Sequence, residues 1–504
     1  MDIDHILATV SSGFFAAQVL TIVFLCALGY VLIWAFCAKT DRAGRILLSF
    51  FTGLSYYCAV IYAMLVVKIR ISIPRMIFAA LIAFVIVAAS AGIYRKKLFG
   101  RFLPDPKDLV IKELLILMAA ALVLACIATS GLLSVSLDND SYYYYSTYPQ
   151  MMIKEGDLKF EFDVLLTDVG PVAAVINTLP FVFGFSNTYG IQHFMNFVFI
   201  ILFAYVLFTE GMEKGLSRRS SGAVSLIAAL FLATSPAYLT TAKWVMAGDW
   251  FMVFFFLLAY FGYRDSKGSG EDMAPVLMLF SFMVTMVRQE GPMMISFLAM
   301  CFCILKVRGI RIDLLYMVPA LIASGFYYLR IFVFLGVRPL YAFLTRQKAL
   351  LIIAMLLAVS AGILIIKTKP FERLQKRLSM LIILAAALLN LAMLAVNRER
   401  YLTNLYSFFM NVRLRNGWGY FGYVFFVFII LAVVFAIIYK DRVISFFDVL
   451  MIGYIMIAVC AAWGRGDHLR VGTGDSGNRV MLTAVPLIVF AMALRMGKVI
   501  GARK

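Results

Sequence analysis

Apolar runs long enough to cross a lipid bilayer recur from one end of this chain to the other. A helix needs about 20 apolar residues to cross roughly 30 Å of hydrocarbon. The chain is 63% hydrophobic and only 14% charged, and a soluble fold could not hide so much apolar surface in a single core. The sequence therefore predicts an all-α polytopic membrane protein with about 13–15 transmembrane helices and no separate soluble domain.

The expected spans follow from the apolar runs, and their ends follow from the charged residues. They are 14–38, 46–67, 76–94, 109–135, 191–208, 221–240, 248–263, 274–287, 291–306, 313–335, 349–366, 378–396, 420–439, 446–463 and 480–494. The run 274–287 is short for a full crossing. The seven cysteines fall within or at the ends of these spans, and we interpret them as apolar packing residues.

The longest polar segment, 136–190, follows the fourth span and carries seven acids against two bases. Its first acids, Asp138 and Asp140, stand where a membrane helix meets water. Such carboxylates can accept a proton from a hydroxyl group or bind a divalent cation such as Mg²⁺ or Mn²⁺ through oxygen. The alternative is a polar cap that ends the helix. The tyrosines that follow, among them Tyr142 and Tyr145, could stack on sugar rings, although an interfacial tyrosine belt is the default for most of them.

Lysines and arginines are concentrated in alternate loops, as the positive-inside rule requires. This pattern places the acidic segment and the N-terminus outside and the basic C-terminal tail in the cytoplasm. The net charge of +19 is therefore an orientation signal, and nucleic acid is not an expected partner. The late outer loops are also basic, which suits a site that binds a phosphate opposite the acidic segment 136–190. Binding of anionic lipid head groups is the alternative.

The last outer loop, 463–486, combines glycines with basic residues. Its side chains Arg465, His468, Arg470 and Arg479 could form charge-assisted bonds to a phosphate, and the alternative is a flexible connection. Three more charged residues are candidate substrate contacts. Arg288 and Glu290 lie at a helix break, where a turn salt bridge is the slightly favoured interpretation, and Asp249 fits either a helix N-terminal acid or an outer-site ligand. His193 and two further histidines show no ligand spacing, so zinc and haem are not expected.

Several segments together resemble the GT-C fold glycosyltransferases, which use polyprenyl-phosphate sugars. Their relatives include protein mannosyltransferases and the aminoarabinose transferases of lipid A. The segments are the acidic loop with Gly170–Pro171, then 235–261 with its proline and aspartate, and VRQEGPMM at 287–294. The resemblance implies a GT-C-like domain at 109–504 whose catalytic acid is Asp138 or Asp140. It also implies an added three-helix segment at 1–108, and Asp168 becomes a further substrate contact in the loop.

The leading hypothesis is a glycosyltransferase on the outer face of a bacterial cytoplasmic membrane. It would move a sugar from a polyprenyl-phosphate donor to a glycan, lipid or protein acceptor, in a single inverting displacement. The sequence identifies no definite cofactor, and a divalent cation (Mg²⁺ or Mn²⁺) on the two aspartates is an option. The alternatives are an O-antigen-type polymerase or ligase and, from a different class, a lipid or solute transporter or flippase. A transporter predicts internal repeats and charges buried at mid-span.

Overall fold

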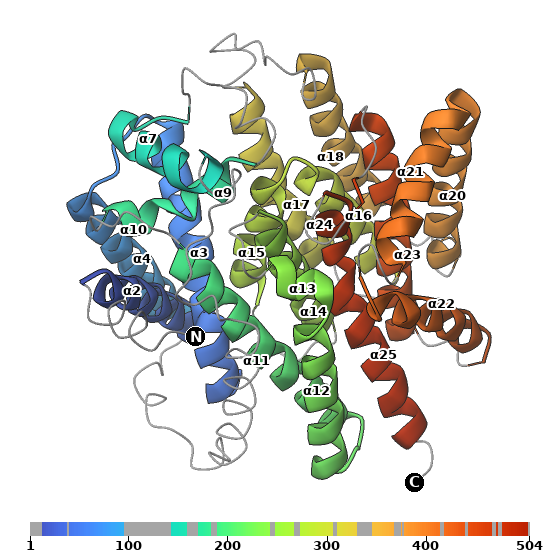
Figure 1. Cartoon of the computed structure of the whole chain (residues 1–504). Helices are drawn as coiled ribbons and strands as arrows, with labels where there is room; N and C mark the ends of the chain where they lie inside the picture. Colours follow the sequence, from blue (N-terminus) through green and yellow to red (C-terminus); the bar gives the residue numbers. More distant parts are fainter. Residues whose placement is uncertain are drawn as a thin grey trace.

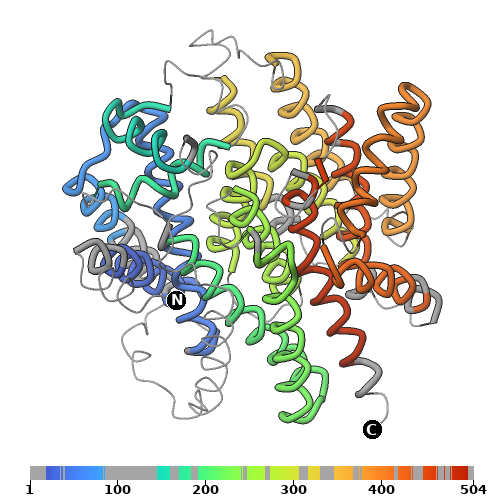
Figure 2. Tube along the Cα trace, viewed as in Figure 1, coloured from blue at the N-terminus to red at the C-terminus, as the bar shows by residue number. Residues whose placement is uncertain are grey.

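The computed structural model describes most of the chain as a bundle of helices (Figures 1 and 2). The described residues are 13–37, 40–94, 143–158, 170–182, 189–241, 247–266, 273–305, 310–329, 345–366, 374, 377–413, 418–438, 442–465, 470–471 and 476–501. Every element bounded within these ranges is helical. The expected all-α class is thus confirmed for the described part, whereas the expected fourth span, 109–135, lies outside it.

The long helices coincide with the expected apolar runs. They are α2 (Gly13–Phe36), α3 (Arg42–Val66), α4 (Ile73–Tyr94), α11 (Tyr189–Glu213), α12 (Arg218–Ala233), α14 (Ala247–Ser266), α15 (Ala274–Val287), α16 (Gly291–Phe302), α17 (Ile310–Tyr328), α18 (Arg346–Ile366), α20 (Leu378–Val396), α22 (Phe421–Ile438), α23 (Arg442–Arg465) and α25 (Ala484–Gly501). Among the described residues, five helices are long and apolar enough to cross a membrane: those at 43–66, 191–213, 346–366, 378–396 and 479–497.

Further helices lie mostly in segments between the expected spans. They are the π-helical turn η2 (Tyr143–Thr147), α7 (Tyr148–Glu155), α9 (Pro171–Val175), α10 (Thr178–Val182), α13 (Pro236–Thr241), α21 (Arg398–Val412) and α24 (Ser476–Leu482). Pro236 divides the expected span 221–240, because proline lacks the backbone N–H that a continuous helix uses. Helix α21 is the largest addition, since 398–412 was expected to be an outer loop.

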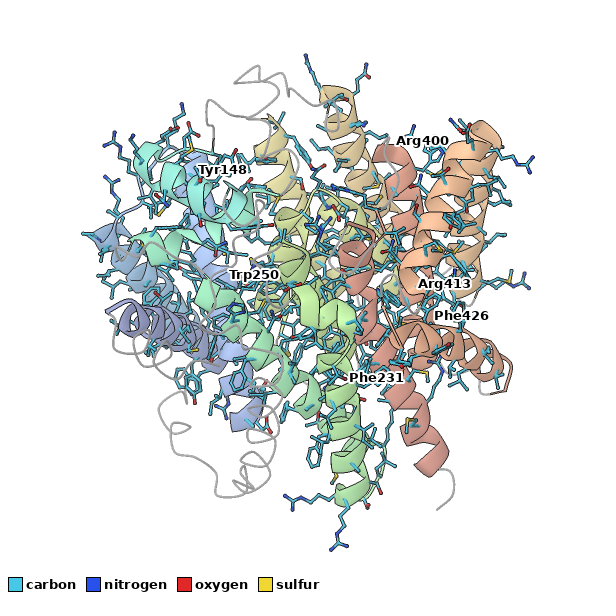
Figure 3. All side chains as sticks on the ribbon, in the orientation of Figure 1. Tyr148, Phe231, Trp250, Arg400, Arg413 and Phe426 are labelled. Carbon is cyan, nitrogen blue, oxygen red and sulfur yellow. The ribbon has the colours of Figure 1, made fainter. Side chains whose placement is uncertain are left out.

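The centre of the bundle is α14, which is buried along almost its entire length (Figure 1). Figure 3 shows Trp250 in the middle of the molecule, and its side chain is fully buried. A ladder of phenylalanine and tyrosine rings runs down α14 and packs against α3, α11 and α25 through pairs such as Phe51–Phe254 and Phe256–Phe490. At the other extreme, α18 and α20 are mostly exposed, as expected of helices that face lipid.

The N-terminal helices are joined closely to this core. Helices α2 and α3 touch through their backbones, since a Cβ atom on Gly29 would lie 1.8 Å from the Ser49 carbonyl oxygen. Helix α3 then forms long-range hydrogen bonds: Tyr57 Oη lies 2.6 Å from Thr178 Oγ1, and Tyr62 Oη donates to Ala323 O at 2.8 Å. The division at residue 108 stays a prediction, but α3 itself is packed within the main hydrophobic core.

Two ionic groups, one partly buried and one buried, stabilise the end of the bundle away from the start of α14. Arg264 near the end of α14 pairs with Glu210 and Glu213 of α11. Arg495 of α25 pairs with Asp448 of α23, and its guanidinium carbon lies 5.3 Å from the centre of the Phe428 ring. Pairing of this kind is what allows a charge to remain inside an apolar bundle.

Candidate functional site

Seven of the 12 site residues that the sequence predicts lie within the described part of the chain. The exceptions are Asp138, Asp140, Tyr142, Asp168 and His468, which lie outside the described residues. Arg465 is the last residue of α23. The remaining candidates, Tyr145, Asp249, Arg288, Glu290, Arg470 and Arg479, are carried by five different elements or by the turns beside them, and most of them gather near the first turn of α14.

Tyr145 connects the acidic segment to α14. It lies in η2 and is 3% exposed, and its hydroxyl oxygen accepts a hydrogen bond from Ala247 N at 2.6 Å. Ala247 is the first residue of α14, so this bond satisfies one of the backbone N–H groups that a helix leaves unpaired at its start. Tyr148 is likewise 5% exposed. The default of an interfacial tyrosine belt is therefore wrong for these two residues, because both are packed into the core.

Asp249 stands in the first turn of α14 and is 1% exposed. Its Oδ2 accepts hydrogen bonds from Gln192 Nε2 at 2.8 Å and Asn196 Nδ2 at 3.4 Å, both on α11. Tyr238 of α13 in turn donates to the Asn196 carbonyl oxygen at 3.1 Å. Asp249 Oδ1 accepts no hydrogen bond from the described residues. The aspartate is thus a first-turn acid, as one of the two interpretations expected, and it still has an unused acceptor.

The turn between α15 and α16 carries the Arg288–Glu290 ion pair, whose Nε and Oε1 atoms are 2.5 Å apart. The turn is tight, because a Cβ atom on Gly291 would lie 2.2 Å from the Val284 carbonyl oxygen. Burial is the largest single influence and acts to lower the pKa of Arg288, but the charge and hydrogen bond of Glu290, together with the nearby Tyr454 and Tyr145, raise that pKa above its usual value. The structure thus contains the expected turn salt bridge, and a contact of either residue with a substrate stays a prediction.

The end of the acidic segment is pressed against the same turn. Gly170 precedes α9, and a Cβ atom there would lie 2.0 Å from the Met286 carbonyl oxygen, one residue before the end of α15. Only glycine allows two backbones to approach so closely. The Gly170–Pro171 pair quoted for the family resemblance thus fixes the acidic segment next to the Arg288–Glu290 turn.

Gly248 lies next to the guanidinium of Arg288 and next to the backbone and Cβ atom of Arg479. From the position that its Cβ atom would occupy, Arg288 Nη1 is 3.6 Å away, Arg479 O is 3.7 Å away and Arg479 Cβ is 4.0 Å away. Nε of Arg288 is engaged by Glu290, whereas Nη1 is the atom next to Gly248. Two cationic residues that are far apart in the sequence therefore lie beside the start of α14, where helix N–H groups also favour an anion.

Tyr454 of α23 holds the segment that carries Arg479. Its buried hydroxyl donates to the Val480 carbonyl oxygen at 2.7 Å, and it lies close enough to the Arg288–Glu290 pair to interact electrostatically with both groups. Arg470 is exposed and stands shortly before α24, outside the immediate contacts of Gly248. Of the four predicted phosphate ligands, Arg479 is thus the one that the described contacts join to Arg288.

Sequence reasoning missed several polar residues of this region. They are Gln192, Asn196, Gln289, Asn411 and Tyr454. Gln192 and Asn196 are one helical turn apart in an apolar run, and that spacing is a signal of a shared polar face that could have been used. Gln289 Oε1 is buried and accepts no hydrogen bond from the described residues, in the turn between Arg288 and Glu290. Such an oxygen can accept a bond from water or from a ligand hydroxyl.

The described residues could therefore bind an anion and, beside it, accept hydrogen bonds from hydroxyl groups of a ligand. Arg288 and Arg479 supply cationic donors, and Asp249 Oδ1 and Gln289 Oε1 supply acceptors. Within the described ranges no group of three His, Cys, Asp or Glu side chains could hold a metal ion. The predicted divalent-cation site on Asp138 and Asp140 lies outside these ranges and stays a prediction.

No protein-family model, curated protein or solved structure matches this chain, so no family is assigned by comparison.

Proposed function

We propose that this protein is a membrane glycosyltransferase that takes a sugar from a polyprenyl-phosphate donor and transfers it to an acceptor at the outer face of the membrane. The observation that supports the proposal best is the convergence of Arg288 and Arg479 on Gly248 at the start of α14. Arginine is well suited to bind phosphate because its planar group offers several N–H donors.

The donor phosphate would lie against these arginines. Negative charge accumulates on the phosphate as the sugar leaves it, and fixed cations that meet this charge lower the barrier of such a reaction. Glu290 balances part of the charge of Arg288. The site could therefore bind one phosphate group without burying an excess of positive charge when it is empty. Asp249 and Gln289 would orient the sugar through its hydroxyl groups.

Asp138 or Asp140 would act as the base. The acceptor oxygen or nitrogen attacks the anomeric carbon, its proton passes to the carboxylate, and the bond from that carbon to the phosphate oxygen breaks. The phosphate leaves with the bonding electrons, and polyprenyl phosphate is released. A single displacement of this kind inverts the anomeric centre. The pair would also be the position of a divalent cation, if one assists the leaving group.

The proposed topology completes this assignment. About 13–15 spans, with the acidic segment after the fourth, would place the start of α14 and the turn after α15 on the outer side. The membrane would be the cytoplasmic membrane of a bacterium. The prenyl chain of the donor would then lie in the bilayer, and the acceptor would be a glycan, lipid or protein.

The test compares the purified wild type with Asp138→Asn, Asp140→Asn and Arg479→Ala. Polyprenyl phosphate should bind saturably to the wild type and to both asparagine variants, and binding should be weakened in the arginine variant. Transfer from a polyprenyl-phosphate sugar should be lost in at least one asparagine variant that folds normally. Normal transfer in both asparagine variants removes the base assignment. Absence of saturable binding to any of the proteins removes the lipid donor and favours a transporter.

A further inference from the structure

Helix α21 carries polar residues on its buried face. Asn404, Ser407 and Asn411 are spaced so that they lie on one side of the helix, and each is at most 3% exposed. The opposite face is apolar and exposed, with Leu402, Leu405, Tyr406 and Phe409. Helix α21 packs through its inner face against α20, α23 and α24 (Figure 1). Burying an amide side chain is unfavourable unless its hydrogen-bonding groups are used, so the inner face must have specific partners.

Asn411 joins three segments at one point. Its Nδ2 donates to Ser407 O of its own helix at 2.8 Å and to Arg470 O at 3.1 Å. Both partners are carbonyl oxygens, so the atom that faces them must be the amide nitrogen. The backbone of Asn411 also accepts a hydrogen bond from Trp418 N at 2.9 Å, which fixes the connection to α22.

The carbonyl group of Arg470 is held from two sides. It accepts one bond from Asn411 and a second from Gly477 N at 3.1 Å, in the first turn of α24. Gly477 has no room for a side chain, because a Cβ atom there would lie 2.3 Å from Asn411 Nδ2. The amide of Asn411 is thus in direct contact with both ends of the segment that leads into α24.

Helix α24 carries Arg479 only two residues after Gly477. The helix also packs against α13, α14, α23 and α25, and its contacts include Gly248 at the start of α14 and Tyr454, which donates to Val480 O. The position of Arg479 is therefore set by these helices together with Asn411 of α21.

We propose that Asn411 is a positioning residue for the phosphate site: by holding Arg470 and Gly477 it fixes α24, and through α24 it fixes Arg479. It does not touch the reacting atoms. The effect on donor binding rests on the proposed function, whereas the effect on α24 rests only on contacts within the protein.

The test uses Asn411→Ala and Asn411→Asp, with Asn404→Ala as the matched control. Asn404 lies on the same buried face of α21, and its amide donates to Arg400 O of its own helix at 2.9 Å. We expect both Asn411 variants to raise the donor KM and the dissociation constant for polyprenyl phosphate about tenfold, the effect of about one hydrogen bond. The acceptor KM should be unchanged, and Asn404→Ala should keep wild-type donor binding.

Hydrogen exchange of the α24 amides tests the positioning role of Asn411 separately from its effect on donor binding. Exchange in residues 476–482 should be faster in the Asn411 variants than in Asn404→Ala at equal thermal stability. Unchanged exchange overturns the positioning role, whatever the protein binds. Faster exchange in a protein whose wild type binds no polyprenyl phosphate would instead retain the positioning role and reject the proposed donor. Faster exchange with unaltered donor affinity would show that α24 does not place a donor ligand.

Discussion

Gly248 provides the sharpest test of where the donor phosphate binds. Its absent side chain leaves the space between Arg288 Nη1 at 3.6 Å and Arg479 Cβ at 4.0 Å from the Cβ position. Alanine fits there, since both distances are ordinary van der Waals contacts. Valine adds two carbons about 1.5 Å beyond Cβ, and a carbon directed at either arginine would approach it to roughly 2–2.5 Å, well inside the ~3.5 Å of normal contact.

Gly248→Val should therefore displace one of the arginines by about 1 Å or more. Losing one charge-assisted hydrogen bond of about 1.5–3 kcal/mol weakens binding by roughly ten- to a hundredfold. We expect this loss of affinity for polyprenyl phosphate in Gly248→Val, measured by titration in detergent, and nearly wild-type affinity in Gly248→Ala. Overpacking should also lower the free energy of unfolding, by about 1–3 kcal/mol.

The matched control is Gly325→Val in α17, where no atom lies within 4 Å of the Cβ position. This variant carries the same cost of a β-branched residue in a helix but leaves the arginines in place, so its donor affinity should equal that of the wild type. A folded Gly248→Val protein that binds the donor as tightly as the wild type would refute the placement of the phosphate between Arg288 and Arg479.

Three further substitutions follow from described contacts. Arg479→Ala should weaken donor binding more than acceptor binding, and equal donor affinity in two parallel titrations would remove Arg479 from the site. Arg495→Met should lower the free energy of unfolding by about 3–5 kcal/mol, because it leaves Asp448 buried without its partner. The double variant with Asp448→Leu should regain most of that loss, as measured by thermal unfolding. Equal losses of stability in the single and double variants would contradict this reasoning. Tyr145→Phe removes the acceptor for Ala247 N and should cost about 1 kcal/mol, which an unchanged unfolding midpoint would disprove.

Helix positions could be predicted from the sequence where apolar length alone decides them. The expected spans 274–287 and 378–396 coincide with α15 and α20, and most others differ by a few residues at each end. The prediction was wrong for 398–412, where arginines at the start of the segment suggested a loop. Several of its apolar residues, such as Leu402 and Phe409, are exposed, whereas buried polar residues lie on the inner face. This is the reverse of a soluble helix, so a search for an inward-facing apolar stripe does not find it.

The candidate site was predictable only in part. Charged residues in apolar surroundings, such as Arg288 and Asp249, stand out in a sequence because burying them is costly. Gly248 and Tyr454 do not, since one is a common small residue and the other resembles the many interfacial tyrosines. Their importance comes from contacts with other helices, such as that between Gly248 and Arg479, which no local sequence pattern records.

The bond between Tyr62 and Ala323 also bears on how the protein is made. The two residues are 261 positions apart, so at a synthesis rate of about 5–20 residues per second α3 waits roughly 13–50 s for its partner on α17. Throughout that interval the Tyr62 hydroxyl lacks the Ala323 carbonyl group of α17, and its ring lacks the contact with Phe282 of α15. The Tyr62 hydroxyl must therefore bind to the insertion machinery, to lipid or to water until the middle of the chain has been synthesised.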